Sequence, residues 1–125
     1  MTPLLFLGIA VAGGIGAVTR FALDGVIRSR TRSRHPLGTL VINISGSLLL
    51  GAVTGLALAG LLPDSARLIL GTGFLGGYTT FSTASLETVR LLQERRRVGA
   101  LLHGPGMLVA SVLAASLGLW LGGLA

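Results

Sequence analysis

Four long apolar windows dominate the pattern of hydrophobic and polar positions along this 125-residue chain. They cover residues 3–27, 37–62, 66–92 and 98–124, to within a few residues at each end. Each window is longer than the roughly 20 residues that a helix needs to cross a bilayer. The polar connections between them are too short to hold a soluble domain. The pattern therefore predicts an all-α membrane protein whose residues 1–125 form a single domain of four transmembrane helices.

The third window departs from an ordinary membrane helix at its centre, where residues 71–83 read GTGFLGGYTTFST. The pair Gly76–Gly77 weakens a helix there, because glycine has the most backbone freedom to lose. In lipid, a weakened helix must satisfy its freed backbone groups inside protein or along a water-lined cavity. We therefore expect this helix to be broken at its centre and to carry a functional site. Close helix packing through small residues is the simpler alternative.

Polar residues also interrupt the first two windows. Asn43 lies inside the second, where its amide needs partners, either at a functional site or in an interhelical hydrogen bond. Arg20 and Asp24 are four residues apart in the first, so they can pair on one helix face. Arg20 alone fits either an arginine that snorkels to the membrane surface or a basic entrance that attracts anions. Glu87 is near the end of the third window and fits an interfacial charge.

Small residues predict where the helices approach one another closely. The first window carries Gly13–Ala17, the second has Gly51 and Gly55, and the fourth has Gly118 and Gly122. Small residues four apart let two helix backbones come into contact. His103 and Trp120 fit interfacial positions in the fourth window. We do not expect His103 to bind a metal, because His35 lies in a loop and is not at ligand spacing.

Composition supports the membrane assignment and excludes several other classes. The chain is 51% hydrophobic and only 11% charged, with mean hydropathy +0.84, whereas soluble domains have about a quarter charged residues. It has no cysteine, so disulfides and thiolate metal sites are excluded. The sequence offers no nucleophile–base pair, carboxylate pair or metal cluster, so we do not expect an enzyme.

The positive charge is placed asymmetrically, and this predicts the topology. The net charge is +6, and the arginines gather in the connections at residues 28–36 and 93–97. Beside apolar spans, such a surplus is a topology signal and does not call for nucleic acid. The positive-inside rule places both connections in the cytoplasm and both termini outside a bacterial inner membrane. We expect one fixed, multi-pass orientation.

Three motifs follow one another along the chain. They are GGIGAVTRF at Gly13–Phe21, GTLVINISGSLLLG at Gly38–Gly51 and GFLGGYTTFST at Gly73–Thr83, and Glu87 follows the last. In these motifs, and in its length, the chain resembles the CrcB/Fluc family of fluoride channels. The resemblance covers nearly the whole chain, although the fourth helix matches loosely.

The resemblance implies an antiparallel dimer of four-helix subunits in the lipid bilayer, with two narrow fluoride pores near the interface. It also implies a structural sodium ion at the centre, held by the backbone carbonyls of Gly76 and Thr79. Carbonyls at a broken helix suit such a hard cation. Transport would be passive, and it would remove fluoride from the cytoplasm.

The resemblance also assigns pore positions. The family's pore asparagine and first pore phenylalanine match Asn43 and Phe81, its vestibule basic residue matches Arg20, and candidates for a polar track are Ser82, Thr83 and Ser111. Fluoride is small and strongly hydrated, so its dehydration must be offset by close donors. Amide and hydroxyl hydrogens can supply these, and so can the positive edge of an aromatic ring.

Two positions depart from the family's pattern. Ala84 stands where the family usually has a second phenylalanine, and Met107 stands where it usually has a tyrosine. The strong charge bias also opposes insertion in both orientations, which an antiparallel homodimer requires. We therefore expect either a homodimer or one subunit of a heterodimer with an oppositely oriented homologue.

Two other functions stay open. One is a non-transporting membrane subunit, which the missing aromatics would suit. The other is a proton-coupled small exporter, which needs a carboxylate embedded in the membrane. None of the chain's four acidic residues lies near the centre of an apolar window.

Overall fold

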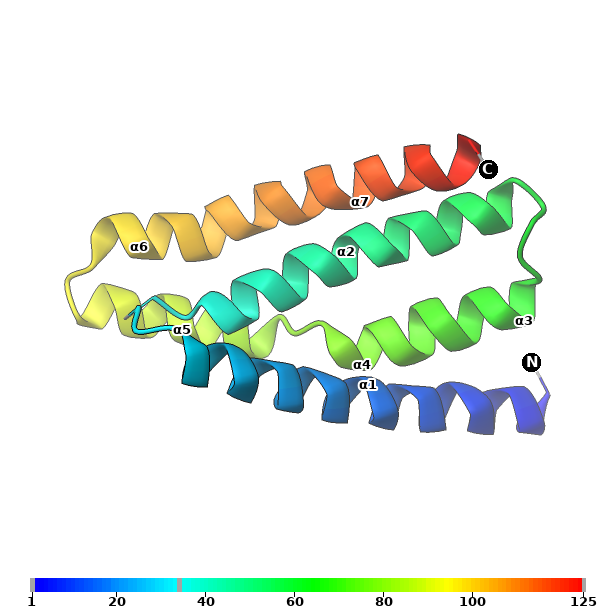
Figure 1. Ribbon diagram of the computed structural model, residues 1–125, viewed down its shortest axis with the longest axis horizontal. Helices are drawn as coiled ribbons and strands as arrows, with labels where there is room; N and C mark the ends of the chain where they lie inside the picture. The colour runs from blue at the N-terminus through cyan, green and yellow to red at the C-terminus, as the bar shows by residue number, and fades with distance from the viewer. Residues whose placement is uncertain (1, 34, 125) are drawn as a thin grey trace.

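Four helical rods lie side by side in the computed structural model, which describes residues 2–33 and 35–124 (Figure 1). The all-α prediction is confirmed. The elements in chain order are α1 (Pro3–Arg30), α2 (Leu37–Leu58), α3 (Asp64–Arg67), η1 (Leu68–Leu75), α4 (Gly76–Tyr78), α5 (Ser82–Gln93), α6 (Arg97–Leu101), η2 (Leu102–Gly106) and α7 (Met107–Leu124). The segments η1 and η2 are wider π-helical turns that run directly into the α-helices before and after them.

Three of the rods are continuous helices long and apolar enough to cross a membrane: α1, α2 and the rod Arg97–Leu124 made of α6, η2 and α7. The rod formed by α2 ends at Leu58, earlier than the apolar window suggests. Gly60 follows with φ +78°, a left-handed conformation that favours glycine, and Pro63 precedes the next helix. The chain therefore turns before the apolar run is finished.

The remaining rod, from Asp64 to Gln93, is broken between α4 and α5 (Figure 1). The predicted break is confirmed, but it lies at Thr79–Phe81 and not at the glycine pair, which is still helical. Gly77 instead serves packing, because a Cβ there would run into the carbonyl oxygen of Gly13 on α1. Thr79 leaves the helix in an extended conformation, with φ −80° and ψ 161°.

Glycines form both long seams between rods, as the spacing of small residues predicts. Along α1, a Cβ on Gly16 would overlap the carbonyl oxygen of Phe74. Between α2 and α7, a Cβ on Gly51 would overlap the carbonyl oxygen of Ala115, and one on Gly118 that of Leu48. These backbones are thus close enough that any larger residue would push the rods apart.

The buried core is small, and most large apolar side chains face outward. A cluster of Ile42, Leu75 and Tyr78 forms the core between α2 and the broken rod. Thirty large hydrophobic side chains, distributed over all four rods, are exposed. An apolar surface of this extent is typical of a protein that contacts lipid or another membrane subunit.

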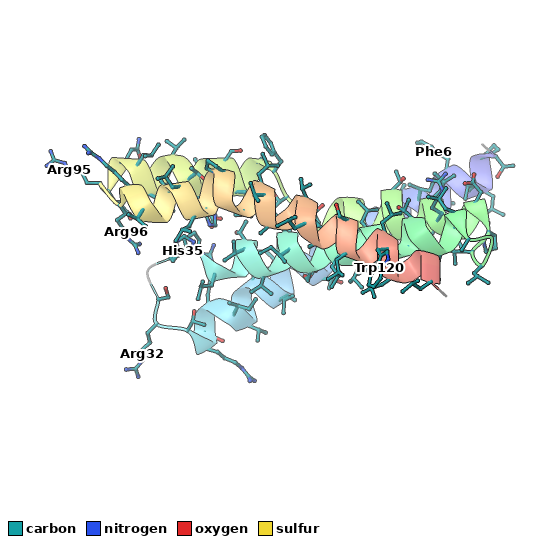
Figure 2. All side chains as sticks on the ribbon, turned by 90° about the horizontal axis from the view of Figure 1, so that it is seen from above. Phe6, Arg32, His35, Arg95, Arg96 and Trp120 are labelled. Carbon is teal, nitrogen blue, oxygen red and sulfur yellow. The ribbon has the colours of Figure 1, made fainter. Side chains whose placement is uncertain are left out.

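Both chain ends lie at one end of the bundle, together with the turn from α2 to α3 (Figure 1). The other end carries the connection from α1 to α2 and that from α5 to α6. Arg32, Arg95 and Arg96 project there, away from Phe6 and Trp120 near the opposite end (Figure 2). The arginine-rich connections therefore share one end of the molecule.

Candidate functional site

Asn43 on α2 holds the broken segment in place. Its Nδ2 donates to the carbonyl oxygen of Thr80 at 2.7 Å, and its Oδ1 accepts from the Thr80 amide at 2.9 Å. The side-chain amide thus pairs with Thr80 as a neighbouring strand would, with both of that residue's backbone groups satisfied. Because an unpaired backbone group in an apolar setting is costly, this pair explains why the helix breaks here.

The break also frees backbone carbonyls from their usual helical partners, among them those of Gly76 and Thr79. A continuing helix would bond the Gly76 carbonyl to the Thr80 amide, but that amide is bonded to Asn43. It would bond the Thr79 carbonyl to the Thr83 amide, but that amide donates to the Thr80 hydroxyl at 3.2 Å. The carbonyls of Gly76 and Thr79 are therefore available to another partner.

A groove of about 470 Å³ lies beside the break, between the broken rod, α2 and the rod Arg97–Leu124. It contains three of the predicted pore residues, Asn43, Phe81 and Ser111, and both departures, Ala84 and Met107. Its wall is completed by the residues Ser47, Leu50, Thr79, Thr80, Ser85, Thr88, His103, Gly104, Pro105 and Leu108. The ring of Phe81 is 86% exposed at the edge of this groove.

Four other predicted site residues are not among the residues that line the groove, whereas Thr79 is part of its wall. Ser82 and Thr83, at the start of α5, are not among its lining residues, and neither is Gly76. Arg20 on α1 is also outside the lining, and within residues 2–33 and 35–124 no hydrogen-bond partner reaches its buried Nε. Three of the five predicted pore positions therefore line one groove, and the other two, Ser82 and Thr83, stand between its lining residues Phe81 and Ala84 in the sequence.

The predicted pairing of Arg20 with Asp24 is wrong. Asp24 instead pairs with Arg28, whose Nε is 3.1 Å from its carboxylate. Both spacings are four residues, but an acid placed N-terminal to its basic partner is the better orientation on a helix. Arg20 is left for another role.

Met107 contacts Asn43 directly. Its Sδ is 3.3 Å from Nδ2 of Asn43, so it accepts the second amide hydrogen, while Thr80 accepts the first. A thioether is a weak acceptor. A stronger acceptor such as an anion could therefore take this hydrogen without breaking the pair with Thr80.

A buried cluster that the sequence reasoning missed lies near the arginine-rich end. The His103 ring is 1% exposed, and its Nε2 is 3.2 Å from Oε1 of Glu87, which is also buried. Its Nδ1 is 3.2 Å from Nε2 of His35. Glu87 and His103 are thus buried within the protein, and His35, which lies in a loop, contacts His103.

Chain geometry explains why these residues meet. Glu87 and His103 are each eight residues from Arg95, and Arg95 turns the chain with φ +61° between two antiparallel helices. Residues at equal distances on either side of a hairpin turn lie opposite each other, so this spacing could have predicted the contact between Glu87 and His103. The contact of His35 had no such signal, because a loop residue's position depends on tertiary folding.

The surroundings of this cluster are basic. A guanidinium nitrogen of Arg28 is 3.7 Å from Oε2 of Glu87. Burial lowers the pKa of His35, and the nearby charges of His103 and Arg96 lower it further, while Glu87 acts in the opposite direction. His35 is therefore neutral over a wider range of pH than a free histidine.

Comparison with known proteins identifies the chain's family. Residues 7–123 match the family described as "CrcB-like protein, Camphor Resistance (CrcB)". The chain belongs to the CrcB family. The resemblance drawn from the three motifs is therefore confirmed, and it extends over the fourth helix as well.

Curated relatives of this CrcB chain are named as fluoride channels. "Fluoride-specific ion channel FluC 1" of Leifsonia xyli subsp. xyli is 62% identical over 125 residues, which cover 100% of this chain and 91% of the relative. "Fluoride-specific ion channel FluC 2" of Cutibacterium acnes is 56% identical over 121 residues, 95% of this chain and 98% of the relative. The FluC 2 protein of Mycobacterium tuberculosis is 45% identical, over 97% of this chain and 93% of the relative.

Proposed function

We propose that this CrcB chain is a subunit of a passive, fluoride-selective channel that exports fluoride from the cytoplasm. The carrying observation is the groove at the helix break, where a partly buried asparagine presents an amide hydrogen to a weak acceptor. The names of its full-length relatives support fluoride as the ion. Membrane-length helices with an apolar exterior support conduction across a bilayer.

The groove offers an anion a consistent set of donors. Asn43 can turn one amide hydrogen from Met107 to fluoride, and Ser111 provides a hydroxyl on the same wall. The first turn of α5 borders the groove through Phe81, Ala84 and Ser85, so the positive end of that helix dipole lies at its wall. Broken membrane helices commonly use this end to face anions.

The opposite end of the break suits a cation. The carbonyls of Gly76 and Thr79 have lost the amides that a continuous helix would give them. Carbonyl oxygens are the ligands that hard cations such as sodium prefer. We infer that these two carbonyls hold a structural sodium ion, and that a second subunit supplies the remaining oxygens.

The second subunit would also complete the pore. Phe81 projects from the monomer beside an open groove, and an aromatic ring in that position has too few contacts within one chain. Ala84 and Met107 lack the aromatic groups that the family usually has there. We therefore favour an oppositely oriented homologue that provides these rings, with a second copy of this chain as the alternative.

The orientation in the membrane follows from charge. The arginine-rich connections lie at one end of the bundle and both termini at the other (Figures 1 and 2). We propose that the arginine-rich end faces the cytoplasm of a bacterial cell. Fluoride would then enter the groove from the end that carries His35 and His103.

The test is fluoride efflux from liposomes, measured with a fluoride electrode. A channel moves charge, so efflux down the gradient is expected only after valinomycin lets potassium balance that charge. We would test the chain alone and together with a homologue from the same genome. Efflux from the chain alone supports a homodimer, and efflux only with the homologue supports a heterodimer.

The same assay separates the competing functions. Efflux driven by a pH gradient without valinomycin would replace the channel with a proton-coupled exporter. The measurement with a pH gradient is necessary because Glu87 is buried beside His103, where a carboxylate could exchange protons. Absence of efflux from both folded preparations would indicate a non-transporting subunit.

Sodium is tested separately by exchange. Purification in N-methylglucamine in place of sodium is expected to lower the midpoint of thermal unfolding, because a ligand that binds only the folded protein stabilises it. Added sodium should restore the midpoint, whereas added potassium should not. Equal midpoints in all three solutions would contradict the sodium site.

A further inference from the structure

We propose that His103 is a further fluoride-contacting residue of the groove, and that it becomes available when a second proton releases His35 from it. This inference rests on the proposed fluoride conduction. His35, Glu87 and His103 are called the histidine clasp below. It joins the connection before α2 to α5 and η2, elements far apart in sequence.

The hydrogen bonds of the clasp fix where its protons lie. An ionised carboxylate only accepts, so Nε2 of His103 must carry the hydrogen that bonds Glu87. When both rings are neutral, Nδ1 of His103 therefore has a lone pair, and Nε2 of His35 donates to it. In this state both ring nitrogens of His103 are occupied, and the ring has no donor to offer an ion.

The clasp can hold one extra proton but not two. The first fits on Nδ1 of His35, and every existing bond is kept. A second proton must go to Nδ1 of His103, where an N–H would face another N–H across 3.2 Å. Two imidazolium rings in that arrangement repel each other, so His35 must leave.

The charged groups around the clasp determine when it opens. Arg96 faces His35 from the α5–α6 turn, and Arg28 faces Glu87 from α1. Both guanidinium groups disfavour additional positive charge on the clasp, although Asp24 partly neutralises Arg28. Oε1 of Glu87 lies 3.2 Å from Nε2 of His103. The pKa of His35 is lowered, so its neutral form is favoured by folding. The contribution of His35 to stability is therefore complete above its ordinary pKa of about 6.5 and is lost at lower pH.

Opening the clasp changes what the groove offers to an anion. His103, Met107 and Ser111 recur every four residues along one rod, and all three line the groove. His103 is the member nearest the arginine-rich end. Once His35 leaves, Nδ1 of His103 carries a charged N–H in the space that His35 occupied, at the arginine-rich end of this wall. Charge-assisted hydrogen bonds are about twice as strong as neutral ones. His103 would thus extend the donor track of Asn43 and Ser111 toward the cytoplasm.

Figure 2 shows where this connection lies. His35 is labelled where the stretch between α1 and α2 comes near the α5–α6 pair, and Arg96 projects on the same side. The contact of His35 is therefore at the mouth of the proposed path. Its departure would uncover His103 without moving α2 or α7.

The first experiment measures efflux against pH. Wild-type efflux from liposomes is expected to rise at least about threefold as the pH falls below about 6.5, the ordinary pKa of histidine, because the pKa of His35 is lowered. In His103→Gln this rise should be lost. In His35→Ala it should be kept with its midpoint moved to higher pH, because nothing then donates to Nδ1 of His103. Protein-free liposomes at each pH correct for leakage of hydrogen fluoride.

The second experiment needs neither transport nor a variant. Nitrogen-15 NMR of the histidine rings should show His35 and His103 titrating in two coupled steps. Fluoride should shift Nδ1 of His103 at the acid end only, and chloride at equal concentration should not. If fluoride leaves His103 unshifted and efflux does not vary with pH, the inference is wrong while the proposed function stands. If the shift is present without efflux at any pH, the proposed function fails while the anion contact stands.

Discussion

At the scale of single residues, Asn43 performs two tasks with one amide group. Its oxygen and one hydrogen satisfy the backbone of Thr80, and its other hydrogen rests against Met107. From the sequence, a site role and an interhelical hydrogen bond were both open. The structure shows that Asn43 makes the interhelical bond, and the groove position makes the two roles compatible.

Replacing Asn43 tests the structural task. Asn43→Ala leaves the amide and the carbonyl of Thr80 without partners, which costs about 1–3 kcal/mol for each group left unsatisfied. We expect the midpoint of thermal unfolding to fall and fluoride efflux to be lost. Ser116→Ala is the matched control, because that exposed hydroxyl bonds only its own helix at Val112. Unchanged melting of Asn43→Ala would show that the break is held by other contacts.

Replacing Met107 tests the second task. Met107→Leu keeps the volume of this buried side chain and should cost under about 1.5 kcal/mol of stability. It removes the sulfur acceptor and leaves one hydrogen of Asn43 free for fluoride. A hydrogen bond with a net contribution of about 0.5–1.5 kcal/mol corresponds to about twofold to tenfold in affinity. The concentration of fluoride at half-maximal efflux should fall by that factor, and an increase would contradict the role of Met107.

At the scale of elements, the apolar composition of the chain determines where the helical rods form, whereas a tertiary contact from Asn43 determines where the third rod breaks. The apolar windows predicted the helices, and glycine spacing predicted both seams. The position of the break was misplaced because Gly76–Gly77 was treated as a weak point. Its actual position depends on the reach of Asn43 from another rod, which no local pattern contains. The contact between His35 and His103 was missed for the same reason.

The seam between α1 and the broken rod gives a prediction with a close control. Gly77→Ala would place a methyl group against the carbonyl oxygen of Gly13, and neither backbone can yield without moving its rod. Overpacking of this kind costs about 1–3 kcal/mol. Gly14→Ala lies one residue from that contact and meets nothing within 4 Å. We expect Gly77→Ala to unfold at lower temperature and Gly14→Ala to match the parent, as measured in detergent by circular dichroism.

At the scale of the whole molecule, orientation decides which assembly can form. Within an antiparallel dimer of identical chains, half of the copies must enter the membrane with arginine-rich connections outside. The positive-inside rule opposes this, because those connections are short and carry most of the chain's positive charge. In the antiparallel dimer proposed above, a chain restricted to one orientation needs a partner restricted to the other.

Orientation can be measured directly because the chain contains no cysteine. Ser33→Cys and Ser65→Cys place exposed thiols at opposite ends of the bundle, in the α1–α2 connection and in α3. In intact cells, a membrane-impermeant maleimide should label Ser65→Cys and should reach Ser33→Cys only after the cells are permeabilised. The unmodified chain controls for background. Substantial labelling of both variants in intact cells would mean that the chain inserts both ways, so a homodimer could supply its own second subunit. Labelling of Ser65→Cys alone would require an oppositely oriented homologue, and it would explain why Ala84 and Met107 are tolerated, since the missing rings would come from that partner.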